Sequence, residues 1–150
     1  MRMVSQGTDT EKFFKYYIIK TCDESSVDLR ERFLQIEYLS KLLTRFVEPK
    51  KHYEDSGELI RIIDVLKEEV EKAEVSIEAY KIAADKILFY QSFFPEAFKK
   101  RLLDIKFYAD AARTFYRIVG HYKFPVCGLI SQEYSLWNFI LKSTKMRYLF

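Results

Sequence analysis

An acidic stretch in the middle of the chain holds the residues best suited to bind a divalent metal ion. Four glutamates recur there at three- and four-residue steps, a spacing that places them on one side of a helix: Glu68, Glu71, Glu74 and Glu78. A di-metal carboxylate centre in a helical bundle also needs Glu-x-x-His motifs, and neither His52 nor His121 has a glutamate three residues before it. Lys67 and Lys72 each stand four residues from an acid of this stretch, a spacing at which opposite charges pair on the surface of a helix. We therefore interpret it as a charged helix surface and expect no metal ion and no cofactor.

A second candidate centre pairs Arg45 with His52 in the stretch RFVEPKKH. The six residues between them resemble the spacing found in HEPN-type ribonucleases, which are helical RNA-cleaving proteins. That resemblance implies that both residues act near a dimer cleft. Pro49 falls inside the motif and predicts that His52 lies in a loop. RNA cleavage by Arg45 and His52 is thus an alternative, and we assign no catalytic residue.

The C-terminal third is basic and rich in aromatic residues. Residues 96–150 carry ten basic and four acidic side chains, a net charge of +6. On a helical wheel centred on Tyr108, however, most rings gather on one side and the cations on the other. A groove that stacks bases needs rings and cations on the same accessible face. Nucleic-acid binding is therefore possible but not favoured, and its expected phosphate contacts are Lys99, Lys100, Arg101, Lys106, Arg113 and Arg117.

Other chemistries lack their motifs. Cys22 and Cys127 are far apart without CxxC spacing, so we expect reduced, buried thiols. The chain has no glycine-rich phosphate loop. It contains neither a run of 18 apolar residues nor the apolar stretch of a signal peptide, which predicts a cytoplasmic protein without a membrane partner. Abundant Lys, Arg and Glu beside a single Asn lean toward a heat-adapted source.

The elements that must position these residues are all predicted to be helices. Only four glycines and three prolines interrupt 150 residues, and apolar residues recur at three- and four-residue steps. We predict an all-α fold, a single-domain helical bundle of five to seven helices that spans residues 1–150. The first predicted helix ends before the stretch DESS, the second runs from 27 to about 47 and is capped by Ser26, and the third covers about 57–91. A short helix follows at Pro95. The next covers about 105–119, with Asp104 as its cap and Gly120 near its C-terminal end, and the last covers about 126–145.

The stretch over 57–91 is unusually long. Its apolar residues keep a heptad-like spacing from Leu59 to Ile87 without an intervening Gly or Pro. A straight helix of that length would extend about 50 Å and outreach a domain of this size. Two outcomes stay open: a straight helix whose overhang pairs with a second subunit, or a helix interrupted near Ser76.

The segment from Leu59 to Val119 resembles an uncharacterised bacterial family of small all-helical proteins. The similarity rests on an acidic helix, then the turn FFPE, then a tyrosine-rich helix that contains FYADAARTFYRIV. It implies a helical domain and adds no activity and no catalytic residue.

With no catalytic constellation, the leading hypothesis is a non-enzymatic protein-interaction module. The long stripe and the many tyrosines predict that its partner is a second copy of the chain, as a homodimer, or another protein. Two alternatives remain, an RNA-binding or RNA-cleaving helical protein and a carrier with an aromatic pocket for a small apolar ligand.

Overall fold

The computed structural model describes residues 9–47, 76–99 and 103–149 of the chain. These residues form six α-helices and two short helical turns, and none of them belongs to a strand. The α-helices are α1 (Asp9–Glu24), α2 (Phe33–Phe46), α5 (Ile77–Phe93), α6 (Ile105–Tyr122), α7 (Pro125–Gln132) and α8 (Tyr134–Thr144). A 3-10 turn, Pro95–Phe98, follows α5, and a wider π-type turn, Lys145–Leu149, follows α8. The predicted all-α bundle is confirmed.

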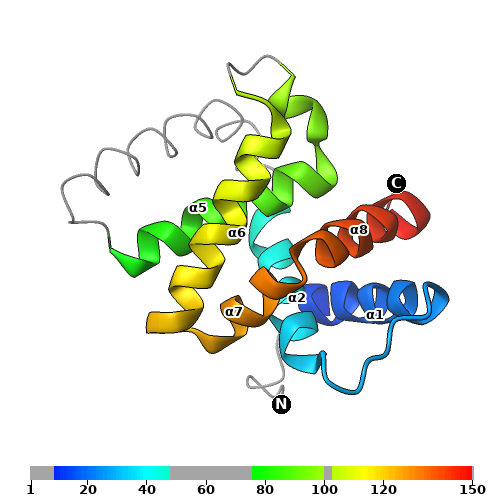
Figure 1. Ribbon diagram of the computed structural model, residues 1–150. Helices are drawn as coiled ribbons and strands as arrows, with labels where there is room; N and C mark the ends of the chain where they lie inside the picture. Colours follow the sequence, from blue (N-terminus) through cyan, green and yellow to red (C-terminus); the bar gives the residue numbers. More distant parts are fainter. Residues whose placement is uncertain (1–8, 48–75, 100–102, 150) are drawn as a thin grey trace.

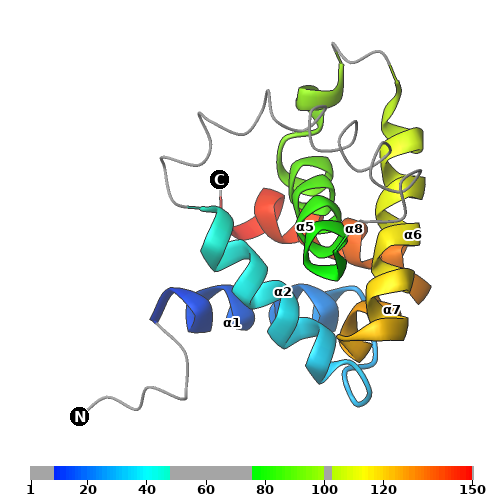
Figure 2. The same cartoon turned by 90° about the vertical axis from the view of Figure 1, so that its left-hand side faces the viewer.

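The helices form two packed groups, which are joined through α2 and through the contact of α8 with α5. The first and last helices, α1 and α8, lie side by side although they are far apart in sequence (Figure 1). On the other side, α5 and α6 pack against each other, and α6 also packs closely on α7. Helix α2 contacts α1, α5 and α7, and it crosses in front of α1 in the view turned by 90° (Figure 2).

Aromatic side chains fill much of the core between these helices. Trp137, Tyr116 and Tyr134 are almost fully buried. Phe89 on α5 stacks on Phe46 of α2, with ring centroids 5.0 Å apart, and on Phe93 one turn along its own helix at 5.1 Å. Each such ring removes about 150–250 Å² of mostly apolar surface from water. The aromatic content of the sequence is thus used mainly to hold the bundle together.

Of the two outcomes left open for the stretch over 57–91, the structure has the interruption at Ser76. Ser76 has an extended backbone, and its hydroxyl accepts a hydrogen bond from the amide of Ala79 at 3.1 Å, so it caps the N-terminus of α5. A single helix over 57–91 is therefore not formed, and the prediction for the heptad-spaced part before Ser76 lies outside the described residues. The overhang of a straight helix no longer argues for a second subunit.

The predicted start of the second helix is wrong. Ser26 does not cap it; its φ of 61° places it in the left-handed region, just after α1 ends. The amide of Val27 bonds back to the carbonyl of Cys22, and Asp28 then accepts hydrogen bonds from the backbone and side chain of Arg30. These local bonds keep the segment out of helical conformation until Phe33, where α2 begins.

Two predicted boundaries in the C-terminal half differ from the structure. The predicted end of α6 at about Val119 is early, because the helix continues to Tyr122, and Gly120 lies near that end as expected. The backbone of Gly128 on α7 passes so close that a Cβ added at Gly120 would lie 2.2 Å from the Gly128 nitrogen, so this glycine permits a close helix crossing. The helix predicted over 126–145 is two helices, α7 and α8, separated at Glu133.

The segregation of rings and cations on α6 is confirmed with two exceptions. Tyr108 and Tyr116 face the core, whereas Arg113 and Arg117 are exposed. The helical wheel centred on Tyr108 also places Ile105 and Tyr122, at the two ends of the helix, on the core side, but both are exposed. Asp104 caps α6 as predicted, by accepting a hydrogen bond from the amide of Phe107 at 3.0 Å.

Candidate functional site

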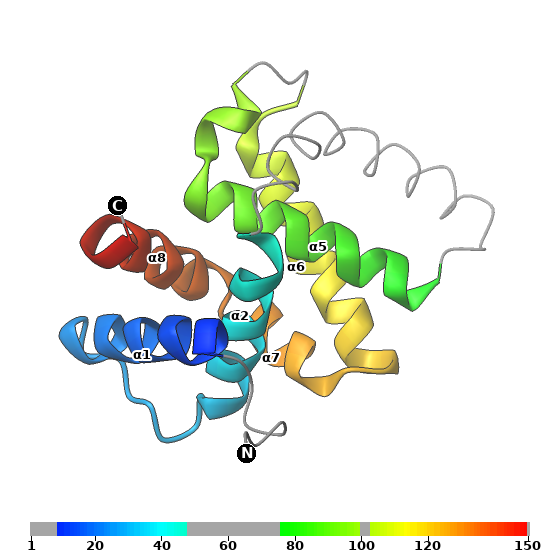
Figure 3. The same ribbon diagram turned by 180° about the vertical axis from the view of Figure 1, so that it is seen from behind.

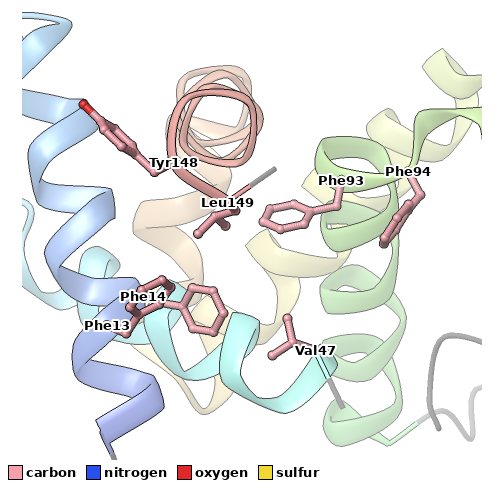
Figure 4. A pocket seen from close by; sticks show the side chains of 7 residues that line it. All are labelled: Phe13, Phe14, Val47, Phe93, Phe94, Tyr148 and Leu149. Atoms are coloured by element: carbon pink, nitrogen blue, oxygen red, sulfur yellow. The ribbon is translucent and has the colours of Figure 1, made fainter. Parts of the chain in front are cut away.

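An apolar cavity of about 230 Å³ lies where the ends of several helices meet. Helix α1 contributes Phe13 and Phe14, and the C-terminal end of α2 contributes Val47. The remaining walls come from the end of α5 and from the C-terminal turn, through Phe93, Phe94, Tyr148 and Leu149. Figure 4 shows these side chains around the cavity, and the view from behind shows α1, α2 and α8 gathered on one side of α5 (Figure 3).

The described walls of this cavity are aliphatic or aromatic. Phe14 and Phe93 are almost completely buried, whereas Phe13 is 46% exposed and forms part of the rim. The Tyr148 hydroxyl points away from the cavity (Figure 4) and donates a hydrogen bond to Glu24 at 2.5 Å. The cavity is open to solvent at this rim, but its described walls offer no partner to a charged or polar group, so it is best suited to a neutral, largely apolar molecule.

A buried carboxylate forms the second candidate centre. Asp85 on α5 is fully buried, and both of its oxygens accept hydrogen bonds. The hydroxyls of Tyr38 on α2 and Tyr116 on α6 donate to Oδ1, at 2.6 and 2.7 Å. Arg45 of α2 and Lys81 of α5 donate to Oδ2, at 2.8 and 3.3 Å. The single carboxylate thereby ties three helices together.

The groups around Asp85 are held in their protonated forms. Burial, followed by the charge of Asp85, raises the pKa of Tyr116 well above its ordinary value, and the same two causes raise that of Tyr38. Burial raises the pKa of the neighbouring Cys127 thiol to about 11, so it carries almost no thiolate at neutral pH. The tyrosines remain donors and the thiol remains unreactive. With four donors on its carboxylate, the Asp85 centre is suited to hold helices together rather than to catalyse.

Of the alternative Arg45–His52 centre, only Arg45 belongs to the described residues. Arg45 lies in the Asp85 network, where its side chain is 41% exposed. His52 lies outside the described residues, so its pairing with Arg45 stays a prediction. Among the described residues, no group of three or more His, Cys, Asp or Glu side chains could hold a metal ion. Within the same part of the chain, no helix has the length and apolar character needed to cross a membrane.

The predicted phosphate contacts do not form one free basic surface in the described ranges. Lys100 and Arg101 lie outside those ranges, and Lys99 is exposed. Lys106 and Arg113 both pair with Asp110, at 3.3 and 3.5 Å, as their spacing predicts. The guanidinium of Arg113 also lies 5.7 Å from the centre of the buried Tyr134 ring. Arg117 is exposed on the same helix.

Sequence reasoning missed both centres found in the structure. The cavity residues come from four separate segments, so no local motif unites them. Asp85 did carry a signal, because it stands between Ala83 and Ala84 on one side and Ile87 and Leu88 on the other. An acid in such an apolar stretch predicts a buried, partnered carboxylate. Comparisons of the chain with protein-family models, with curated proteins and with solved structures give no match.

Proposed function

We propose that the protein binds a small, uncharged apolar molecule in the cavity between α1, α2, α5 and the C-terminal turn. The supporting observation is a cavity of about 230 Å³ whose described walls are all aliphatic or aromatic. An apolar cavity of about 150 Å³ in another protein stays dry and takes up benzene. The present one has room for a fused pair of rings or a short aliphatic chain. It is smaller than the roughly 300–1,000 Å³ of sites for drug-sized ligands.

The expected affinity is modest because binding relies on apolar contact alone. A fused two-ring molecule buries about as much surface as an aromatic side chain, roughly 200 Å². At about 25 cal/mol per Å² this burial contributes around 5 kcal/mol, from which the cost of association is subtracted. We therefore expect a dissociation constant on the order of 10⁻³ M or weaker for a molecule such as indole.

Titration with indole, followed by NMR and by thermal unfolding, tests the proposal. At ten times the dissociation constant, binding stabilises the folded state by about 1.4 kcal/mol. For a domain of this size that corresponds to a rise of about 3–6 °C in Tm. Indole-3-acetate should bind more weakly, because its carboxylate would lose water without gaining a partner.

A variant that fills the cavity provides the specific control. Val47→Phe should abolish indole binding by occupying the same space. Val126→Phe, at a half-buried position on α7 that does not line the cavity, should leave binding unchanged. The proposal is wrong if indole gives no saturable shift, or if Val47→Phe binds it as well as the unchanged protein does.

A second candidate function, a protein-interaction module that forms a homodimer, is favoured by exposed rings on α1. Phe13 and Tyr16 are 46% and 58% exposed, and Met146 in the C-terminal turn is 70% exposed. Tyr17 connects α1 with the C-terminal turn, because the centroid of its ring lies 4.9 Å from that of Tyr16 and 4.9 Å from that of Tyr148. Aromatic residues and Met are enriched in the centres of protein interfaces.

Light scattering coupled to size exclusion tests this second candidate. A homodimer should elute with about twice the 18.0 kDa mass of the chain, and Tyr16→Glu should convert it to a monomer. The same mass for both proteins would contradict an interface at Tyr16. A monomeric mass for the unchanged protein at about 50 μM would exclude a dimer with the micromolar affinity that such an interface normally provides.

A further inference from the structure

The C-terminal turn forms one wall of the cavity but has little core of its own. Lys145–Leu149 winds as a π-type turn, a rare geometry that is often found at functional sites. None of its residues is buried, although Tyr148 and Leu149 line the cavity. A segment with so few buried contacts opens at a small fraction of the free energy of global unfolding. Its position must therefore depend on the polar contacts that hold it.

Two of the polar contacts of the turn involve the same acid, Glu24. Glu24, in the last turn of α1, accepts hydrogen bonds from the Tyr148 hydroxyl at 2.5 Å and from Arg147 at 2.9 Å. Tyr148 also stacks on Tyr17 at 4.9 Å, and the ammonium of Lys20 lies 5.2 Å from the centre of the Tyr148 ring. At the other end of the turn, Lys145 donates to the carbonyl of Phe93.

We infer that Glu24 is a positioning residue, which holds the C-terminal turn against α1 and thereby sets how tightly the cavity retains its ligand. The inference rests on the proposed function, since it concerns the same cavity. Glu24 is not among the residues that line the cavity, and it acts through Tyr148 and Arg147. The ring of Tyr148 forms the wall while its hydroxyl faces outward to the acid (Figure 4).

The effect on affinity follows from the population of the closed turn. A ligand that binds only the closed form has an apparent dissociation constant equal to the intrinsic one divided by the closed fraction. If loss of the Glu24 bonds lowers that fraction from near one to about a quarter, indole should bind about fourfold more weakly. The loss should appear in the dissociation rate, because a turn that opens more often releases the ligand sooner.

Tyr148→Phe is the sharpest variant, because it removes the hydroxyl that bonds to Glu24 and leaves the ring in the cavity wall. Tyr122→Phe is its matched control: Tyr122 on α6 is 69% exposed and does not line the cavity, and its hydroxyl has no hydrogen bond to any described residue. Glu24→Ala removes both bonds to the turn at once. All three changes are at the surface, so the folded state should survive each of them.

The experiment measures indole affinity and dissociation rate by NMR, together with amide exchange at residues 146–149. We expect Tyr148→Phe and Glu24→Ala to weaken indole binding about three- to tenfold, to accelerate amide exchange in the turn and to leave Tm almost unchanged. Tyr122→Phe should change none of these. The double variant should bind no more weakly than Glu24→Ala alone. Unchanged affinity in both single variants would overturn the inference and leave the proposed function standing. Absence of indole binding by the unchanged protein would overturn both.

Discussion

Replacing Asp85 by alanine should destabilise the protein more than any change at an exposed acid. Asp85 is completely buried and accepts hydrogen bonds from the two tyrosines, Tyr38 and Tyr116, and from two cations. In Asp85→Ala the hydroxyl of Tyr116, whose side chain has no exposed surface, loses its acceptor. The cations are less affected, because Arg45 and Lys81 are 41% and 21% exposed and can turn toward water.

The magnitude can be estimated from these contacts. A buried hydroxyl left without an acceptor costs about 1–3 kcal/mol, and two hydroxyls are affected. Removing one partner of a buried charge network typically costs about 3–5 kcal/mol in total. We therefore expect Asp85→Ala to lower the free energy of unfolding by about 4 kcal/mol, which corresponds to a fall of about 8–16 °C in Tm for a domain of this size.

Thermal and urea unfolding of a double-mutant cycle measure this effect. Tyr116→Phe alone should cost about 1.5 kcal/mol, because it removes one hydrogen bond to a charged group. In the Asp85→Ala background the same change should cost almost nothing, since the hydroxyl has already lost its acceptor. Asp110→Ala is the matched control: Asp110 is an exposed acid with two cationic partners and should cost less than about 1 kcal/mol. A loss below about 1 kcal/mol for Asp85→Ala, or additive losses in the cycle, would refute the reasoning.

Two further predictions concern the helix crossing and the thiols. In a denaturant titration, Gly120→Ala should lower the free energy of unfolding by about 2 kcal/mol or more, because its Cβ would meet the Gly128 backbone at 2.2 Å. In the same titration Gly128→Ala should be neutral or stabilising, because its Cβ would lie 3.6 Å from the nearest atom. Burial raises the pKa of both Cys22 and Cys127 to about 11, so a disulfide reagent at pH 8 should label them only as fast as the protein unfolds, and rapid labelling would contradict their burial. The ordinary pKa of a cysteine thiol is 9.0, so between pH 9 and 11 the thiols are deprotonated in the unfolded state but still protonated in the folded state. Their contribution to stability is therefore complete below pH 9 and is lost as the pH rises toward 11. The urea midpoint should fall over that range.

Local signals in the sequence predicted two helix starts correctly and pointed to a third. Asp104 caps a helix by accepting a hydrogen bond from an amide three residues later, and Pro95 begins a short helical turn. Ser76, where the sequence left an interruption open, caps α5 in the same way as Asp104 caps α6. In each case the side chain and the backbone it fixes lie within one turn of each other, so the sequence contains the whole interaction. The buried positions of α6 follow in the same way from helical periodicity.

The boundaries that the sequence did not predict depend on contacts between distant segments. No glycine or proline marks the break between α7 and α8 at Glu133. The Glu133 carboxylate receives a two-point contact from Arg32, which lies just before α2, at 2.6 and 3.0 Å. Arg32 is itself fixed by a bond to the carbonyl of Asp28. A helix is thus interrupted where an acid meets an arginine 101 positions away, and periodicity cannot reveal that.

The Asp85 centre and the cavity differ in whether a ligand could bind there without displacing existing contacts. Every oxygen of Asp85 already has donors, so a ligand there would have to displace them. The cavity instead presents apolar side chains that a ligand could cover without displacing a polar contact. Val47→Phe should cover part of this apolar surface and raise Tm without ligand, whereas a lower Tm would show that the walls are already close together and that the space is too small for indole.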